Sequence, residues 1–118
     1  MYGHQILIDH GRNGDGRYIR TRLVHLQRRL VAAGEPVARG QPVGALGRTG
    51  LLSGGIAHLH YEVQTADRPE SHRYRPSNPH LYWAEGAGLV SCYRRDGGYP
   101  EQPFRTTYPV PCAGVPWE

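Results

Sequence analysis

The order of apolar and polar residues along the chain predicts short strands joined by tight turns. Residues 5–9 read Gln-Ile-Leu-Ile-Asp, an apolar and β-branched run that favours an extended conformation within a strand over residues 2–9. Residues 12–16 read Arg-Asn-Gly-Asp-Gly, and both Asn-Gly and Asp-Gly accept the positive φ of a hairpin turn. The pattern therefore predicts a second strand over residues 17–26 that pairs with the first.

The middle of the chain is punctuated by glycine and proline. Residues 30–34 fit one helical turn, which the Gly-Glu-Pro that follows would end. Over residues 37–47 glycine recurs every three or four positions between short apolar pairs, a spacing that favours short strands bent at glycines. We expect a loop over residues 48–55 and a clear strand over residues 57–64.

Composition supports a single all-β domain. The chain has 118 residues, of which 16 are Gly and 10 are Pro, more than helices tolerate. This length supports one modest core. We expect an antiparallel sheet or sandwich with short Gly-bent strands. Residues 1–80 would form the core, and residues 81–118, rich in Pro, Arg, Tyr and Gly, an irregular C-terminal extension packed on the same domain.

The charge of the chain indicates an acidic partner. All 14 basic residues other than histidine are arginines, and the formal net charge is +4. Such a balance suits a nucleic acid, an anionic cell wall or a membrane surface. No stretch approaches the roughly 18 apolar residues of a membrane span, so we expect no membrane insertion. The first residues, Met-Tyr-Gly-His, lack the basic and apolar parts of a signal peptide, and we expect any export signal upstream.

Cys92 and Cys112 are the two cysteines of the sequence. They lie in the irregular tail and do not form a Cys-x-x-Cys pair. A disulfide is the prediction, because a tail with a weak core gains most from a covalent link, and two reduced thiols are the alternative. A disulfide would place the protein in an oxidising compartment.

His58 and His60 lie two residues apart in the predicted strand over residues 57–64. Side chains at that spacing leave the same face of a strand. The two imidazoles are then available to one metal ion or one substrate, because neutral imidazole is a good zinc ligand and also transfers protons near neutral pH. From spacing alone, a pair of surface histidines on a sheet face is the more common arrangement.

Other motifs accompany this pair in a fixed order. They are Tyr2-Gly3, Ile8-Asp9-His10-Gly11, His25-Leu26, residues 34–44 (Gly-Glu-Pro-Val-Ala-Arg-Gly-Gln-Pro-Val-Gly), Gly47-Arg48-Thr49-Gly50, His58-Leu59-His60-Tyr61-Glu62 and Ser77-Asn78-Pro79. The series resembles the lysostaphin-type zinc metallopeptidases, also called the LytM or duplicated-hybrid-motif family. The resemblance covers residues 2–63, and implies a partial duplicated-hybrid-motif, or barrel-sandwich, architecture.

The resemblance also implies residue roles. His60 corresponds to a zinc ligand, while His58 and His25 correspond to the histidines that flank the metal and act on the water and the transition state. A zinc ion lowers the pKa of its water toward about 7, and nearby imidazoles accept the proton or stabilise the oxyanion. The substrate would be a peptide bond of peptidoglycan, cut by an extracellular or periplasmic enzyme that is a monomer when complete. The expected groove residues are Thr49, Gly50 and Tyr61.

The chain departs from this family pattern at the metal site. The family takes its other two zinc ligands from a His-x-x-x-Asp motif upstream of the Tyr-Gly strand, and this chain begins at that strand. His4 and Asp9 have the wrong spacing to replace them. Because a catalytic zinc usually needs three protein ligands, we expect the chain alone to be incomplete and inactive, and the complete protein to carry the motif and an export signal upstream.

Two other functions compete with the peptidase. One is a degenerate, metal-free domain that serves as a cell-wall binding or regulatory module, although nothing would then retain His25, His58 and His60 together. The other is a small basic nucleic-acid-binding β domain, which needs aromatic residues interleaved with Arg on exposed strands. The aromatic residues gather in the tail instead, so we expect no nucleic-acid partner.

Overall fold

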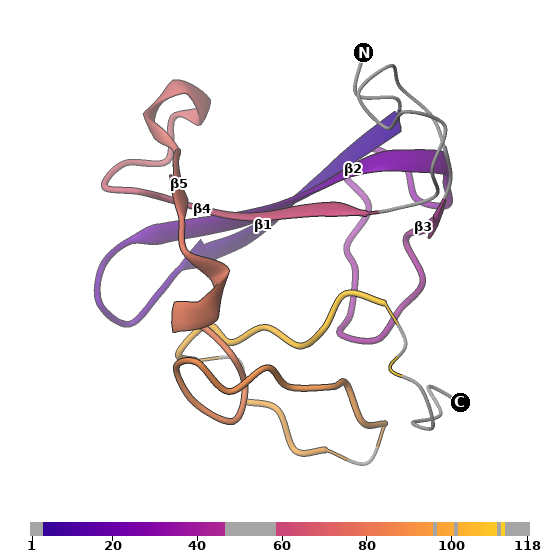
Figure 1. Ribbon diagram of the computed structural model, residues 1–118. Helices are drawn as coiled ribbons and strands as arrows, with labels where there is room; N and C mark the ends of the chain where they lie inside the picture. The colour runs from indigo at the N-terminus through magenta and orange to yellow at the C-terminus, as the bar shows by residue number, and fades with distance from the viewer. Residues whose placement is uncertain (1–3, 47–58, 96, 101, 111, 113–118) are drawn as a thin grey trace. The chain divides into compact units, whose positions relative to one another are not determined.

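The computed structural model describes residues 4–46, 59–95, 97–100, 102–110 and 112, and these form strands, turns and irregular segments (Figure 1). The elements are β1 (His4–Arg12), β2 (Tyr18–Arg29), β3 (Gly44–Leu46), β4 (His60–Ala66), the 3-10 turn η2 (Ser71–Arg73), β5 (Arg75–Ser77) and the 3-10 turn η3 (Pro79–Leu81). The described residues contain no α-helix, and the all-β prediction is confirmed. Among them, no helix has the length and apolar character needed to span a membrane.

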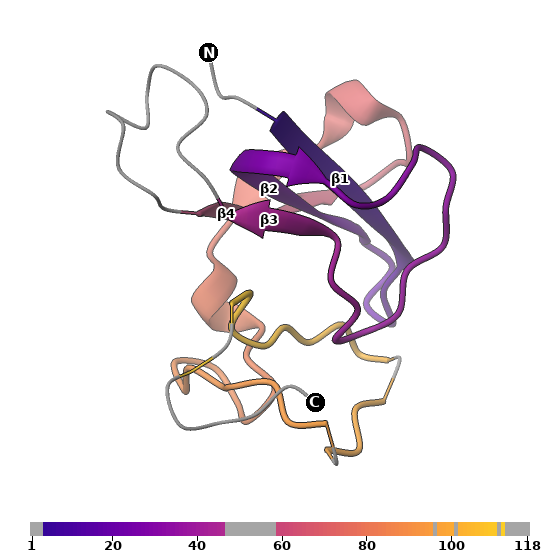
Figure 2. The ribbon, with the colours of Figure 1, turned by 90° about the vertical axis from the view of Figure 1, so that its right-hand side faces the viewer.

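The strands form one sheet in the order β1-β2-β4-β5, and β3 pairs with β2 outside this path. The β2–β3 and β4–β5 pairs are antiparallel, and Figure 2 shows β3 beside β2. β5 pairs with the second half of β4, where Val63 lies opposite Ser77 and Thr65 opposite Arg75. A short fifth strand therefore precedes the predicted irregular tail of residues 81–118.

The predicted hairpin between the first two strands is present. Its turn is closed by backbone hydrogen bonds from Asn13 N to Arg17 O (2.7 Å) and from Gly16 N to Asn13 O (2.9 Å). The Asp15 carboxylate accepts a hydrogen bond from Arg17 N at 3.0 Å, and Gly16 has φ of +90°. The glycine of the Asp15-Gly16 dipeptide thus takes the positive φ that the sequence predicts, whereas Asn13 and Gly14 are not at positive φ.

Residues 30–43 differ from the prediction. The helical turn expected over residues 30–34 is absent. A turn over residues 32–35 is closed instead by the hydrogen bond from Glu35 N to Ala32 O (3.1 Å), and the Glu35 carboxylate accepts from Ala32 N (3.0 Å). A second turn forms where the Gln41 side chain accepts from Ala38 N (3.1 Å). Of the Gly-bent strands expected over residues 37–47, the described part contains β3 alone. The loop expected over residues 48–55 lies outside the described residues.

The chain divides into two compact units, Met1–Ile8 with Thr21–Tyr61 and Asp9–Arg20 with Glu62–Glu118. We call them the first and the second unit. The core of the first unit is aliphatic and small. It consists of Ile6, Leu23 and Leu26, against which Ile8, Val31, Val43, Leu59 and Tyr61 pack.

The tail in the second unit packs on the turn of the β1–β2 hairpin. Phe104 is buried, its ring lies 4.8 Å from that of His10, and its backbone N donates to the Asn13 side chain at 2.7 Å. The Gln102 amide accepts from Gly14 N (3.0 Å) and donates to Arg12 O (3.1 Å). The irregular tail is therefore attached to the sheet by directional contacts as well as by apolar burial.

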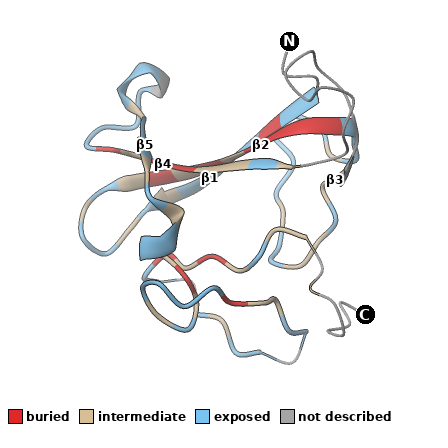
Figure 3. Cartoon of the chain, viewed as in Figure 1, coloured by how far each residue is buried: buried red, intermediate tan, exposed pale blue. Residues whose placement is uncertain are grey.

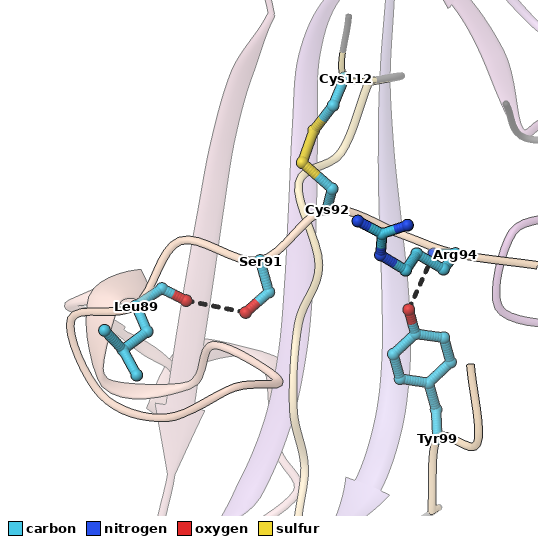
Figure 4. Close-up of a disulfide and its surroundings, with 6 residues drawn as sticks. All are labelled: Leu89, Ser91, Cys92, Arg94, Tyr99 and Cys112. Carbon is cyan, nitrogen blue, oxygen red and sulfur yellow. Dashed lines mark hydrogen bonds between the residues drawn. A yellow bond between two sulfur atoms is a disulfide. The ribbon is translucent and has the colours of Figure 1, made fainter. Parts of the chain in front are cut away.

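Cys92 and Cys112 form the disulfide that the sequence predicts, with their Cα atoms 6.0 Å apart (Figure 4). Next to it, the buried Ser91 hydroxyl donates to Leu89 O at 2.7 Å and accepts from Glu85 N at 2.9 Å. Beyond the disulfide, Arg94 N donates to the Tyr99 hydroxyl at 2.8 Å. The tail is therefore held by the disulfide, by side-chain contacts and by backbone hydrogen bonds between its loops, such as those from Thr106 N to Tyr82 O and from Tyr108 N to Ser91 O, both 2.7 Å.

Candidate functional site

His25 interrupts the regular alternation of β2. Leu23 and Leu26 both belong to the core of the first unit, yet residues three apart on a regular strand point to opposite faces. Between them His25 adopts a left-handed backbone conformation with φ of +68°. A left-handed residue locally interrupts the regular alternation of a strand. The register of β2 against β3 shifts shortly after this residue, between Leu26 and Arg28, and all four residues from Leu23 to Leu26 are buried.

His25 lies within a short buried stretch of β2, coloured red in Figure 3. Its side chain is only 3% exposed. A non-glycine residue at positive φ costs of order 1 kcal/mol, and such strained positions are common at functional sites. The surrounding core of the first unit, with Leu23 and Leu26 on either side, holds the backbone in this conformation.

His25 and His60 lie next to each other. His60 is the first residue of β4 and is exposed, and the centroids of the two imidazole rings are 6.1 Å apart with an interplanar angle of 86°. Two of the three histidines that the sequence singles out are therefore brought together from different strands. One ring is buried and one faces solvent, so a ligand at the exposed ring has a fixed imidazole beside it.

The other predicted site residues have different outcomes. Tyr61 is half-buried and packs against the core of the first unit; its role in a substrate groove stays a prediction. His58, Thr49 and Gly50 lie outside the described residues.

The described residues do not form a complete metal centre. Among them, no group of three or more His, Cys, Asp or Glu side chains lies close enough to hold an ion. A catalytic zinc ion usually takes three protein ligands, whereas this part of the chain offers the His60 imidazole with His25 beside it. We therefore derive no reaction step through a metal from these residues alone.

A polar network that the sequence did not indicate lies in the second unit. Arg20 of β2 donates from Nε to the Gln64 side chain, whose amide nitrogen donates to the Glu62 carboxylate at 2.9 Å. The Arg20 guanidinium also covers the Tyr74 ring, 4.2 Å from its centroid. Glu62 and Gln64 are alternate residues of β4, and this spacing is the sequence signal for a shared face.

Tyr74 is the residue of this network with a perturbed pKa. Burial is the main cause that raises the pKa of its hydroxyl above 10.0, and the negative charge of Asp9 and the neighbouring Tyr18 raise it further. The positive charge of Arg20 acts in the opposite direction. The phenol is therefore held in its neutral form to higher pH than a free tyrosine.

Residues 1–79 match the model of peptidase family M23. This match covers more than half of the chain, and the chain belongs to that family. The resemblance to the LytM-type peptidases noted from the ordered motifs is thereby confirmed.

Similar proteins in Vibrio cholerae serotype O1 carry the name peptidoglycan DD-endopeptidase. ShyC is 52% identical over 56 residues, which cover 42% of this chain and 12% of ShyC. ShyA is 42% identical and ShyB 39% identical over 67 residues, which cover 57% of this chain and 14% of each relative. The chain thus matches only a small part of the length of these relatives. No solved structure matches it significantly.

Proposed function

We propose that this chain is part of a zinc-dependent endopeptidase that hydrolyses peptide bonds of bacterial peptidoglycan. Membership of peptidase family M23 and the printed names of the Vibrio relatives support the reaction and the substrate class. The observation that carries the proposal is the pairing of His25 with His60, 6.1 Å apart between ring centroids. His25 has a positive φ in this pair, and strained backbone of this kind is common at functional sites.

The proposal assigns one role to each histidine. His60, exposed at the start of β4, is a metal ligand, and His25 and His58 hold or transfer protons at the water and at the developing oxyanion. Zinc, when bound, would supply a polarised water molecule. Thr49, Gly50 and Tyr61 are proposed to line the groove for the peptide.

Two further ligands are needed for such a centre, and the family resemblance places them in a His-x-x-x-Asp motif upstream of the Tyr-Gly strand. Residues 1–80 then carry part of the peptidase core, and residues 81–118 an extension packed on it. The Cys92–Cys112 disulfide supports a place of action outside the cytoplasm, because disulfides persist in oxidising compartments. We propose that the complete enzyme acts as a monomer.

A zinc titration tests this function. Calorimetry would compare this chain with a chain extended upstream to include the His-x-x-x-Asp motif, each also as His60→Ala. His72→Ala is the matched control, because His72 is likewise exposed but lies in η2. We expect tight zinc binding and cleavage of peptidoglycan by the extended chain, both lost in His60→Ala and kept in His72→Ala.

The same titration separates the peptidase from a metal-free binding module. Zinc binding that survives His60→Ala would remove this residue from the metal centre. An extended chain that sediments with peptidoglycan but neither binds zinc nor cleaves it would show a degenerate domain with a binding or regulatory role, and the peptidase proposal would be wrong.

A further inference from the structure

The formal charge of the protein is divided unequally between the two units. Counted over the sequence, the first unit has five arginines and one acidic residue, a net charge of +4, whereas the second has nine arginines and nine acidic residues, a net charge of zero. The whole excess of positive charge therefore belongs to the unit that contains His25 and His60. The five arginines are Arg22, Arg28, Arg29, Arg39 and Arg48.

Arg28 and Arg29 form an exposed pair at the end of β2, the strand that carries His25. We call them the basic pair. At a rise of about 3.3 Å per residue, the basic pair begins about 10 Å along the strand from His25. A peptide bound at His60 in an extended conformation spans that distance in about three residues.

The backbone under the basic pair is well defined. The register between β2 and β3 shifts between Leu26 and Arg28, as expected for a bulge, and Arg29 lies opposite Gly44. A Cβ atom at Gly44 would lie 3.0 Å from both Arg28 O and Leu26 Cδ1. β3 thus approaches β2 closely here, and glycine permits this approach.

The one carboxylate of the first unit is used elsewhere. Glu35 accepts a hydrogen bond from Ala32 N at 3.0 Å and closes the turn in which it lies. The formal excess of positive charge in this unit favours an anionic ligand.

We propose that the basic pair binds a carboxylate group of the peptide that reaches His25 and His60, so that the enzyme selects stem peptides bearing free carboxylates. Because neighbouring side chains of a strand leave opposite faces, one arginine of the pair is on the face of the peptide. This inference rests on the proposed function for its substrate and deepens it by naming the recognised group. Guanidinium groups bind carboxylates through directed, charge-assisted hydrogen bonds.

A peptide fits this surface better than a nucleic acid does. Proteins that bind single-stranded nucleic acids use aromatic side chains on which the bases stack. In the sequence of the first unit, Phe, Tyr and Trp together occur twice, both times as tyrosine. One of them, Tyr61, packs against the core. A surface with arginines and without stacking rings favours carboxylates.

The second unit offers a matched control. Arg94 and Arg95 are also adjacent and exposed, so Arg28→Gln/Arg29→Gln and Arg94→Gln/Arg95→Gln lower the net charge equally. Binding of two probes would be measured by fluorescence anisotropy on the full chain: a peptidoglycan stem peptide with free carboxylates, and the same peptide with its carboxylates amidated. Arg28→Lys/Arg29→Lys restores the charge without the planar guanidinium.

We expect the original chain to bind the free-carboxylate peptide more tightly than the amidated one. The Arg28→Gln/Arg29→Gln chain should lose about fivefold in affinity for the former and little for the latter. The Arg94→Gln/Arg95→Gln chain should keep the preference, and the lysine chain should recover part of it. Higher salt should weaken the preference.

Equal losses in the two glutamine chains would overturn the proposal, because net charge alone would then explain binding. The proposal would also be overturned if the original chain bound a single-stranded oligonucleotide more tightly than the free-carboxylate peptide and the Arg28→Gln/Arg29→Gln chain lost this binding. That result would indicate a nucleic-acid surface. These measurements require no hydrolysis. A chain that shows the carboxylate preference but fails the zinc and cleavage tests would thus disprove the peptidase and not the role of the basic pair.

Discussion

The two units of the protein are stabilised by different kinds of interaction. In the first unit, a small aliphatic core around Leu23 and Leu26 holds β2 while the backbone at His25 takes a strained conformation. In the second unit, the tail is held by a disulfide, by hydrogen bonds between its loops such as that from Thr106 N to Tyr82 O, and by side-chain hydrogen bonds such as that from Phe104 N to Asn13. The strained backbone thus lies in the unit that contains the paired histidines. The disulfide lies in the other unit, where the described residues include no such pair.

The largest effect is expected in the tail. Replacing both cysteines, in Cys92→Ser/Cys112→Ser, should lower the free energy of unfolding of the second unit by about 3 kcal/mol, because the open chain regains the entropy of the closed loop. Limited proteolysis should then cleave the tail first. The original chain in reductant is the control and should behave like the variant. Equal protease resistance with and without the disulfide would mean that the contacts of Phe104 and Gln102 suffice.

The core of the first unit offers the next test. Leu26→Ala should lower the free energy of unfolding by about 2–3 kcal/mol, because it removes a buried side chain and leaves a cavity. Leu30→Ala is the matched control, since Leu30 is 49% exposed and Leu26 only 4%, and it should change stability by less than about 0.5 kcal/mol. Chemical denaturation followed by circular dichroism measures both. Similar effects of the two substitutions would contradict the assignment of Leu26 to the core.

Local sequence features predicted more of the fold than of the site. The hairpin turn at Asn13 and Asp15 was correctly predicted, because its signal lies within the turn itself. The contact between Asn13 and Phe104 could not be predicted, since it joins residues 91 positions apart and depends on how the tail folds back. The prediction of a helical turn over residues 30–34 was wrong, because the turn that Glu35 caps by accepting from Ala32 N forms there instead.

The candidate site shows the same limit in another form. His60 and His25 were selected through ordered motifs, and the structure brings them together, but nothing in the motifs indicated the left-handed conformation at His25. Histidine has no local preference for positive φ comparable to that of glycine, so the residue type at position 25 gave no signal for this conformation.

His25 itself provides a sharper test of the strained backbone. His25→Gly should be more stable than His25→Ala by about 1 kcal/mol, because glycine adopts positive φ without steric cost and alanine does not. Thermal unfolding of the two variants measures the difference, and both should lack cleavage activity in the extended chain. If alanine were the more stable of the two, the left-handed conformation at residue 25 would be disproved.

The smallest effect concerns pH and belongs to the second unit. The pKa of Tyr74 is raised above 10.0, mainly by burial and then by Asp9, so the folded state holds the phenolic proton more tightly than the unfolded state does. The stabilisation is complete below pH 10 and is lost as the pH rises through the folded pKa. Tyr74→Phe keeps the ring under Arg20 but removes the titrating group, so its stability should fall less between pH 9 and pH 11. Denaturation at these pH values measures the difference, and identical slopes for the two chains would show that Tyr74 does not contribute to the alkaline loss of stability.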